Sequence, residues 1–367
     1  MTIALYILAI IAVITLTFLA VDLFCTFQTW QRRIGIGRWK DRNKWEEAIT
    51  NRAVKWFQNP PVVSKRDNAR YILWDKINNN YKNSTIQNWQ TAGLLLGLSF
   101  PTKKIELTGN IDDALIGYVY LTNNKNHNAN VSELNAIYST ILSLKQDNGT
   151  IPYRKQLPNI RFVDTVGLIC PFLVKYGLTF ANNDAIELAK AQIGEFSRFL
   201  HPITGTPPHA YDIKKDVPLG IYDWGRGIGW YILGITECYR IVPSGDFHDF
   251  LQKQILSLGE SLLKHQLPSG GFAASLFCAN APAESSATVL CGLLFQQCFE
   301  ITGNEKYYNA TDLVISQLMK LTQRNGAIDM SQGDTKGIGL YSSKYNYMPF
   351  TQGLTLLLLE RVKNAHT

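Results

Sequence analysis

The chain has 367 residues, of which 46% are hydrophobic and 18% charged, and its formal net charge is +7. A chain of this size and composition can bury a large core, so a disordered protein is excluded. The first 45 residues hold six Lys or Arg against two acidic residues and so account for +4 of the charge. The remaining +3 (7 − 4) is too small for a nucleic-acid-binding face.

The first predicted element is a transmembrane helix. Residues 3–24 read IALYILAIIAVITLTFLAVDLF, with Asp22 as the single charge. At about 1.5 Å per residue such a run crosses a hydrocarbon core of about 30 Å. No Lys or Arg precedes it, whereas a cleaved signal peptide begins with a basic leader. A membrane anchor is therefore favoured over a cleaved signal peptide or a buried core helix.

The charges that follow this run predict its orientation. Six basic residues follow the apolar run: Arg32, Arg33, Arg38, Lys40, Arg42 and Lys44. The positive-inside rule then predicts a single-pass protein of the inner membrane, with its N-terminus outside and the rest of the chain in the cytoplasm. Six cysteines without a Cys-x-x-Cys spacing fit a reducing compartment. Four Asn-x-Ser/Thr sequons leave export as the alternative. The predicted division is an anchor over 1–25, a basic juxtamembrane linker over 26–45 and one domain over 46–367.

A unit of two helices recurs after the anchor. One helix of each unit opens with polar or aromatic residues and then becomes almost wholly apolar, which predicts burial on all sides. Six segments have this character: 88–98, 111–121, 163–177, 224–239, 284–303 and 347–362. Amphipathic segments with one charged face, such as 184–200 and 304–321, lie between them. This alternation predicts an all-α fold, an (α/α)6 toroid with an inner ring of helices inside an outer ring.

The links between the helices predict where a site would lie. DNGTIPYR, ITGTPPHAYD, PSGGFAASL and RNGAIDMS each place a Gly-centred turn before an inner helix. In a toroid these loops emerge at one end, so the polar heads of the inner helices converge on one mouth. An open helical solenoid that binds protein is the alternative, although solenoid repeats keep a more uniform length.

Four motifs at the heads of the inner helices resemble a known family. VDTVGLICPF, HAYD, WGRGIGWY and ESSAT, in that order, are similar to the unsaturated glucuronyl and rhamnogalacturonyl hydrolases of glycoside hydrolase families 88 and 105. The resemblance covers about residues 88–362, and IDDALIG adds a fifth match. It implies a six-hairpin fold and a carbohydrate substrate. The sequence has no Gly-rich phosphate loop, zinc spacing or calcium loop, so neither a metal nor a cofactor is expected.

The resemblance also implies an acid. Asp164, seven residues before Pro171-Phe172, falls at the family's general acid and base, and Asp112 at its partner, with Asp113 leaving the register open. The implied reaction hydrates the C4=C5 double bond of a terminal unsaturated uronic acid. A buried carboxyl near a second carboxylate has a raised pKa, so Asp112 and Asp164 are predicted to share a proton. The alternative for each Asp alone is a helix N-cap.

Other residues are expected to contact the sugar. Arg226 is predicted to hold a carboxylate or hydroxyl group, and Trp224 and Trp230 to offer flat faces to sugar rings. Gly225, Gly227 and Gly229 would let the ligand approach the backbone. The alternative is that both Trp fill the core and Arg226 pairs with a neighbouring Asp.

Four further positions complete the expected substrate site. His209 matches a substrate-contacting His of the family, and Trp89 is expected to form another wall. Tyr153 stands where relatives often have His, and Phe162 where they have Trp, so the sugar specificity is expected to differ.

The sequence as a whole predicts a membrane-tethered hydrolase of unsaturated uronyl residues that acts on oligosaccharides. Two other functions remain open. One is an inverting glycosidase that uses two carboxylates on the same toroid. The other is a non-catalytic, membrane-anchored glycan-binding component of a polysaccharide system. The sequence predicts neither the sugar nor the oligomeric state.

Overall fold

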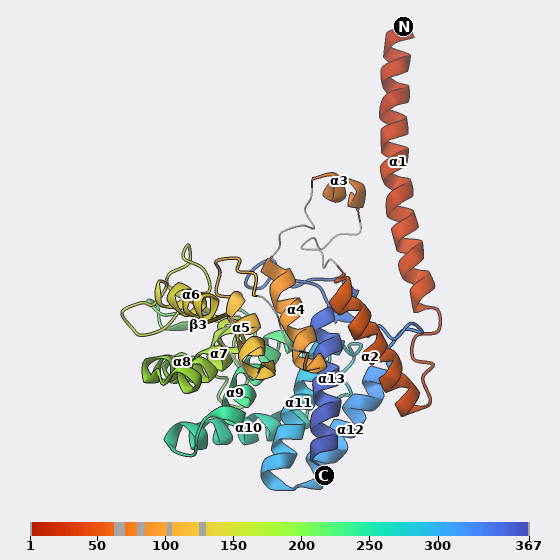
Figure 1. Cartoon of the computed structure of the whole chain (residues 1–367). Helices are drawn as coiled ribbons and strands as arrows, with labels where there is room; N and C mark the ends of the chain where they lie inside the picture. Colours follow the sequence, from red (N-terminus) through yellow and green to blue (C-terminus); the bar gives the residue numbers. More distant parts are fainter. Residues whose placement is uncertain (1, 62–69, 79–84, 101–104, 125–129, 366–367) are drawn as a thin grey trace.

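Six apolar helices form a closed ring at the centre of the molecule in a computed structural model (Figure 1). The structure describes residues 2–61, 70–78, 85–100, 105–124 and 130–365. The inner helices are α4 (Thr85–Leu98), α5 (Asp113–Asn123), α7 (Asp164–Phe180), α9 (Gly225–Ile241), α11 (Ser285–Thr302) and α13 (Pro349–Asn364). Each contacts the next one along the chain, and α13 returns to contact α4. All six predicted inner helices are therefore present.

Amphipathic helices cover this ring from outside. They are α2 (Arg42–Gln58), α6 (Val131–Leu142), α8 (Asn183–Ser197), α10 (Asp246–Leu263) and α12 (Glu305–Lys320). Each of them buries one stripe of side chains and packs on at least one inner helix. Between α4 and α5 the described residues, 99–100 and 105–112, hold no helix. The described chain thus has five outer helices where about six were expected, and the (α/α)6 fold itself is confirmed.

The four predicted turns all contain a glycine in the left-handed region. Gly149, Gly205, Gly270 and Gly326 have φ angles of 79°, 66°, 93° and 81°. A residue with a Cβ rarely adopts such positive φ angles, so each turn favours glycine at this position. Each turn leads the chain from the end of an outer helix back toward the head of an inner one. These turns therefore bring the inner-helix heads to one end of the ring.

Short strands line that end of the toroid. β1 (Ile160–Phe162), β2 (Ala210–Asp212) and β3 (Val217–Leu219) form an antiparallel sheet in the order β1-β2-β3, and β4 (Ser331–Gln332) pairs with β5 (Tyr345–Asn346). β1 ends two residues before Asp164, and β2 begins one residue after His209. The first sheet therefore holds two predicted site residues close to each other.

The ring closes through backbone contact between α4 and α13. A Cβ built on Gly97 would overlap the carbonyl oxygen of Gly353, and one built on Gly353 would overlap the carbonyl oxygen of Gly93. Any side chain at these positions would force the two helices apart. In addition, the backbone N–H of Phe350 donates to Oε1 of Gln90 at 2.9 Å. Small residues therefore allow the first and last inner helices to meet.

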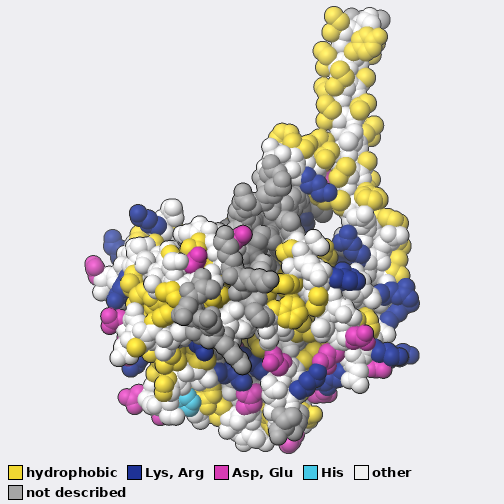
Figure 2. Space-filling model, in the orientation of Figure 1, with side chains coloured by type: hydrophobic (Ala, Val, Ile, Leu, Met, Phe, Trp, Pro, Cys, Tyr) yellow, Lys and Arg dark blue, Asp and Glu magenta, His cyan; other side chains and the backbone are white. Residues whose placement is uncertain are grey.

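α1 (Thr2–Arg33) leaves the toroid as a single helix, and the short helix α3 (Ile72–Ile77) lies against it (Figure 1). α1 is the one described helix long and apolar enough to cross a membrane, and none of its residues is buried. Figure 2 shows apolar side chains along its length. The helix continues past residue 25, and α2 begins at Arg42, so the expected linker over 26–45 contains the ends of two helices.

Candidate active site

Asp164 is the first residue of α7, and only Val163 separates it from β1. Its side chain is partly exposed, yet its Oδ2 atom is buried and has no hydrogen-bond partner among the described residues. The residue that caps α7 is Val163, so the carboxyl of Asp164 is not used as a helix cap. A carboxyl that is accessible on one side and desolvated on the other is suited to proton transfer.

Burial raises the pKa of the Asp164 carboxyl to about 7. The negative charges of Asp334 and Asp112 add to this rise, and the positive charge of Arg226 opposes it. A carboxyl with a pKa near 7 is protonated in a substantial fraction of molecules at neutral pH. Asp164 can therefore act as a general acid and, once ionised, as a general base.

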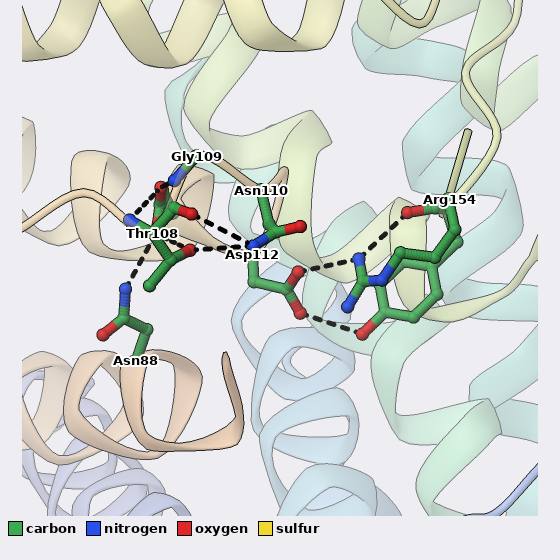
Figure 3. Close-up of polar contacts among 8 residues, drawn as sticks. Asn88, Thr108, Gly109, Asn110, Asp112 and Arg154 are labelled. Atoms are coloured by element: carbon green, nitrogen blue, oxygen red, sulfur yellow. Dashed lines mark hydrogen bonds and ion pairs between the residues drawn. The ribbon is translucent and has the colours of Figure 1, made fainter. Parts of the chain in front are cut away.

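Asp112 precedes α5 and is 1% exposed. The hydroxyl of Tyr153 donates to its Oδ1 at 2.8 Å, and Nη1 of Arg154 lies 2.8 Å from its Oδ2. The guanidinium of Arg154 also lies over the ring of Tyr153, 3.8 Å from its centroid. Figure 3 shows Arg154 beside the Asp112 carboxylate. The charge of Asp112 is therefore balanced by Arg154, an arrangement different from the expected proton shared with Asp164.

Both carboxylate oxygens of Asp113 accept hydrogen bonds from within the protein, as expected for a structural role. Its Oδ1 accepts from the side chains of Asn88, at 2.7 Å, and Thr108, at 2.8 Å. Its Oδ2 accepts from the backbone N–H groups of Thr108 and Gly109, at 2.8 and 3.0 Å. In Figure 3 these three partners lie on the other side of Asp112 from Arg154. Asp113 therefore holds the loop at residues 108–109 against the head of α4. Of the two acids, only Asp112 belongs to the candidate site.

Aromatic rings connect the two acids to the head of α9. The ring of Tyr153 lies 5.7 Å from that of Phe162, which lies 5.5 Å from His209. His209 in turn lies 4.4 Å from Trp224 and 5.4 Å from Tyr341. The structure thus brings four of the sequence-predicted aromatic and His residues together beside Asp164.

His209 is a neutral hydrogen-bonding group in this cluster. Its Nδ1 lies 3.1 Å from the hydroxyl of Tyr341. Burial, together with the charge of Arg226, lowers the pKa of His209 to about 4. The imidazole is therefore uncharged at neutral pH and can exchange hydrogen bonds with a polar ligand without adding charge.

Arg226 is placed differently from the sequence prediction. Its Nη2 donates to the carbonyl oxygen of Gly333 at 2.6 Å, and its Nη1 to that of Gln332. Nε1 of Trp224 donates to Oε1 of Gln332 at 3.2 Å. Arg226 is 2% exposed, and its guanidinium fixes the chain at β4 to the head of α9. Its hydrogen-bond partners are therefore backbone carbonyls, and the alternative of a neighbouring Asp is not realised.

Trp89 and Trp230 fill the core instead of lining a sugar subsite. They are 5% and 3% exposed, and their rings meet edge to face at 5.5 Å. Both also pack on Phe350, at 5.2 and 5.0 Å. These contacts lie between α4, α9 and α13, inside the ring of inner helices. The positions of these two side chains agree with core filling, the alternative that the sequence left open.

The three glycines of WGRGIGWY serve helix packing. A Cβ on Gly225 would lie 2.7 Å from the Cβ of Ala287, and one on Gly229 would overlap the side chain of Leu290 on α11. A Cβ on Gly227 would overlap the ring of Trp224. Gly225 and Gly229 therefore allow α9 and α11 to pack closely, whereas these glycines were expected from the sequence to make room for a ligand.

Sequence reasoning missed Arg154, Gln332 and Tyr341. Arg154 follows Tyr153 directly, so the loop already singled out contained it, but an Arg next to a Tyr carries no signal of its own. Gln332 lies in the two-residue strand β4 and Tyr341 in the loop between β4 and β5, and neither segment has a clear periodicity. A surface hollow of about 420 Å³, lined by residues such as Leu267, Pro268 and Met330, shares no residue with the site.

A closed ring of helical hairpins, with a high-pKa carboxyl near aromatic rings at the heads of its inner helices, defines a six-hairpin toroid. The comparisons with known proteins agree. The model of Glycosyl Hydrolase Family 88 matches residues 80–363. The chain therefore belongs to glycosyl hydrolase family 88.

Solved structures show the same fold. A possible member of family 105 from Salmonella enterica has a TM-score of 0.65 and 16% identity, covering 88% of this chain and 83% of that one. A family 105 glycoside hydrolase of C. acetobutylicum has a TM-score of 0.62 and 17% identity over 87% and 93%. The unsaturated glucuronyl hydrolase of Bacillus sp. GL1 has a TM-score of 0.62 and 15% identity over 91% and 97%. No curated protein matches the chain.

Proposed function

We propose that this protein removes unsaturated uronyl residues from oligosaccharides by hydrating their C4=C5 double bond. The observation that carries the proposal is the carboxyl of Asp164, partly exposed at the mouth, with a buried Oδ2 and a pKa of about 7. Membership of family 88 and the likeness to an unsaturated glucuronyl hydrolase support the substrate class.

Asp164 performs both proton transfers of the reaction. The π electrons of the double bond take the proton of its carboxyl, which forms the C4–H bond and leaves a cation at C5 that the ring oxygen stabilises. Water adds to C5 and gives a proton to the Asp164 carboxylate, so the acid is regenerated. The resulting hemiketal opens, and the aglycone leaves. Because the water proton returns to Asp164, no second acid has to change its protonation state.

Asp112 and His209 are proposed to orient the sugar. Both are buried beside the acid, and both present acceptor or donor atoms of fixed position. The ring of Trp224 packs against that of His209, with 4.4 Å between the centroids, and helps to fix the imidazole. A charged Asp112 balanced by Arg154 binds hydroxyl groups without taking the proton that Asp164 must deliver.

The pH dependence of the reaction tests the role of Asp164. The acid must be protonated when substrate binds, so we expect kcat/KM to be flat below about pH 7 and to fall about tenfold per pH unit above it. Hydration is followed by the loss of double-bond absorbance with a lyase-generated disaccharide. The same assay on a saturated oligosaccharide distinguishes an inverting glycosidase, which would release sugar without an absorbance change. A rate that rises through pH 7 would contradict an acid of this pKa.

Arg154 is expected to determine the pH at which kcat/KM begins to fall. Replacing it in Arg154→Ala leaves the negative charge of Asp112 unbalanced, and this charge raises the pKa of Asp164. We expect the alkaline fall of kcat/KM to move to higher pH, whereas Arg154→Lys keeps the charge and restores the original profile. A lower rate with an unmoved profile would show that Arg154 only supports the loop.

We also propose that α1 anchors the enzyme in a membrane. Four Thr hydroxyls in α1 donate to backbone carbonyls four residues earlier, so they add no unsatisfied polar group to an apolar helix: Thr15, Thr17, Thr26 and Thr29. The basic residues after the span favour a cytoplasmic domain. Reporter fusions at the C-terminus, active only in the cytoplasm or only outside it, decide between this orientation and export.

A further inference from the structure

The end of α1 is clamped to the toroid. Nε and Nη2 of Arg33 donate to the two carboxylate oxygens of Asp329 at 2.8 and 2.9 Å, and Nη2 also donates to the carbonyl oxygen of Tyr345 at 2.6 Å. The side chain of Asp329 is 1% exposed. A two-point guanidinium–carboxylate pair fixes orientation as well as distance. The C-terminal end of α1 is therefore held against the toroid in a defined orientation.

The chain after α1 continues this attachment. The N–H of Gly37 donates to the carbonyl oxygen of Thr322 at 3.0 Å, and Nε1 of Trp39 donates to that of Gln323 at 3.1 Å. Gly37 has a φ of 71°, and a Cβ there would lie 2.6 Å from the carbonyl oxygen of Lys320. The basic segment between α1 and α2 thus lies along the end of α12. It is bound to the toroid and does not act as a flexible linker.

The clamp and the candidate site share the pair of strands β4 and β5. Asp329 precedes β4, and Tyr345 belongs to β5. Gln332 of β4 accepts hydrogen bonds from Arg226 and Trp224 at the head of α9. In Figure 1, α1 rises from the end of the toroid opposite the C-terminus, where α13 ends. The clamp on α1 and the head of α9 are therefore joined through the same pair of strands.

A second contact holds α3 against α1. Oδ2 and Oδ1 of Asp22 accept from the backbone N–H groups of Tyr71 and Ile72, at 2.8 and 3.0 Å. Three large side chains here are exposed: Tyr71 by 62%, Trp74 by 54% and Ile77 by 62%. Tyr and Trp concentrate at membrane–water interfaces. The only charge of the apolar run is therefore used to hold an aromatic element beside it.

The spacing along α1 places these features relative to a bilayer. About 19 residues from Ile3 to Val21 rise roughly 28 Å, which matches a hydrocarbon core of about 30 Å. Asp22 and α3 then lie at its boundary. From Asp22 to Arg33 the helix rises about 16 Å, and Phe24, Phe27 and Trp30 are exposed along this stretch. The clamp at Arg33 thus lies roughly 16 Å from the hydrocarbon boundary, near the lipid headgroups.

We propose that α3 sits in the membrane interface and that the mouth faces the bilayer, so that the natural substrate is a glycan whose reducing end is attached to a membrane lipid. This inference rests on the proposed function. The family match begins at residue 80, after α1, α2 and α3, so this mount precedes the segment shared with the family.

Two measurements on the full chain reconstituted in vesicles test the proposal. The first is tryptophan quenching by lipids brominated near the headgroup. We expect Trp74→Phe to remove a measurable share of the quenching. Trp56→Phe, which changes a 7% exposed ring within the toroid, should leave it unchanged. Equal quenching in wild type and Trp74→Phe would overturn the placement of α3.

The second measurement compares an unsaturated uronyl disaccharide free in solution with the same disaccharide coupled to a phospholipid in the enzyme's vesicles. Tethering raises the effective concentration, so we expect at least a tenfold higher rate for the coupled form at equal bulk concentration. A flexible Gly-Ser insertion after Gln31, between the apolar span and the clamp at Arg33, should lower this ratio because it uncouples the toroid from the span. An unchanged ratio, or equal rates on both substrates, would overturn the membrane-facing mouth and leave the proposed function intact. Turnover of neither substrate would contradict the proposed function, and the quenching would still decide the geometry.

Discussion

Replacing Asp164 by Asn is expected to lower kcat for hydration of an unsaturated uronyl disaccharide by about 10³-fold, within the range for a lost general acid–base group. The amide has nearly the same size and shape as the protonated carboxyl, but it cannot deliver a proton. Because no hydrogen bond to Oδ2 is lost among the described residues, the fold is expected to persist.

Thermal unfolding of the same variant separates chemistry from stability. The raised pKa means that the folded chain holds the Asp164 proton more tightly than the unfolded chain, so this group stabilises the fold at low pH. That contribution is lost as pH rises toward about 7. An uncharged Asn avoids the buried charge, so Asp164→Asn should raise the melting temperature most above pH 7.

Asp249→Asn is the matched control for this variant. It makes the same chemical change in the first turn of the outer helix α10, where the side chain is 77% exposed. Activity and melting temperature should both stay near wild type. Undiminished hydration by Asp164→Asn itself would remove the acid from the proposed mechanism.

The second large effect is expected at a buried ion pair among the inner helices. Nη2 of Arg361 on α13 donates to Oε1 of Glu237 on α9 at 2.5 Å, and the hydroxyl of Tyr118 on α5 donates to Oε2 at 2.7 Å. The side chains of the pair are 7% and 5% exposed. Glu237→Ala would leave a buried guanidinium without its counter-charge, which is expected to destabilise the fold by about 3–5 kcal/mol.

Thermal unfolding of the full chain in detergent measures this loss. Glu237→Leu combined with Arg361→Leu removes both charges and should recover part of the stability. Lys363→Ala is the control. Lys363 lies on α13, as Arg361 does, but it pairs with Glu46 of α2 at the surface, and such pairs contribute about 0–1 kcal/mol. Equal losses in Glu237→Ala and Lys363→Ala would show that the buried pair does not stabilise the toroid.

The pair should also respond to acid. Burial alone would raise the pKa of Glu237, but the charge and hydrogen bond of Arg361 and the hydroxyl of Tyr118 outweigh it and lower the pKa. The stabilisation is therefore present above the ordinary pKa of a Glu and is lost as pH falls through the lowered value. The difference between wild type and Glu237→Ala should shrink in strong acid.

The fold could be predicted because its signals are local. Helices that are apolar all round must be buried, and four Gly-centred turns each required one positive φ angle. The ring order and the convergence of the helix heads follow from these elements. The outer helix expected between α4 and α5 had no clear segment of its own, and the described residues there hold none.

The candidate site was harder to predict because residue type does not show direction. Arg226 and Trp230 both stand at the head of α9, yet one binds backbone carbonyls at β4 and the other packs on Phe350. The glycines around them are needed for contact with α11, which lies about 60 residues further along the chain. Arg33 and Asp329 are 296 residues apart, and no local pattern indicates such a pair.

The glycine contact between α4 and α13 has a consequence for biosynthesis. The N–H of Phe350 meets Gln90 across 260 residues of sequence, so the toroid cannot close until α13 has left the ribosome. Until then the flank of α4 that faces α13 has no partner. The nascent chain therefore passes through an incomplete ring whose open apolar edge is prone to aggregation.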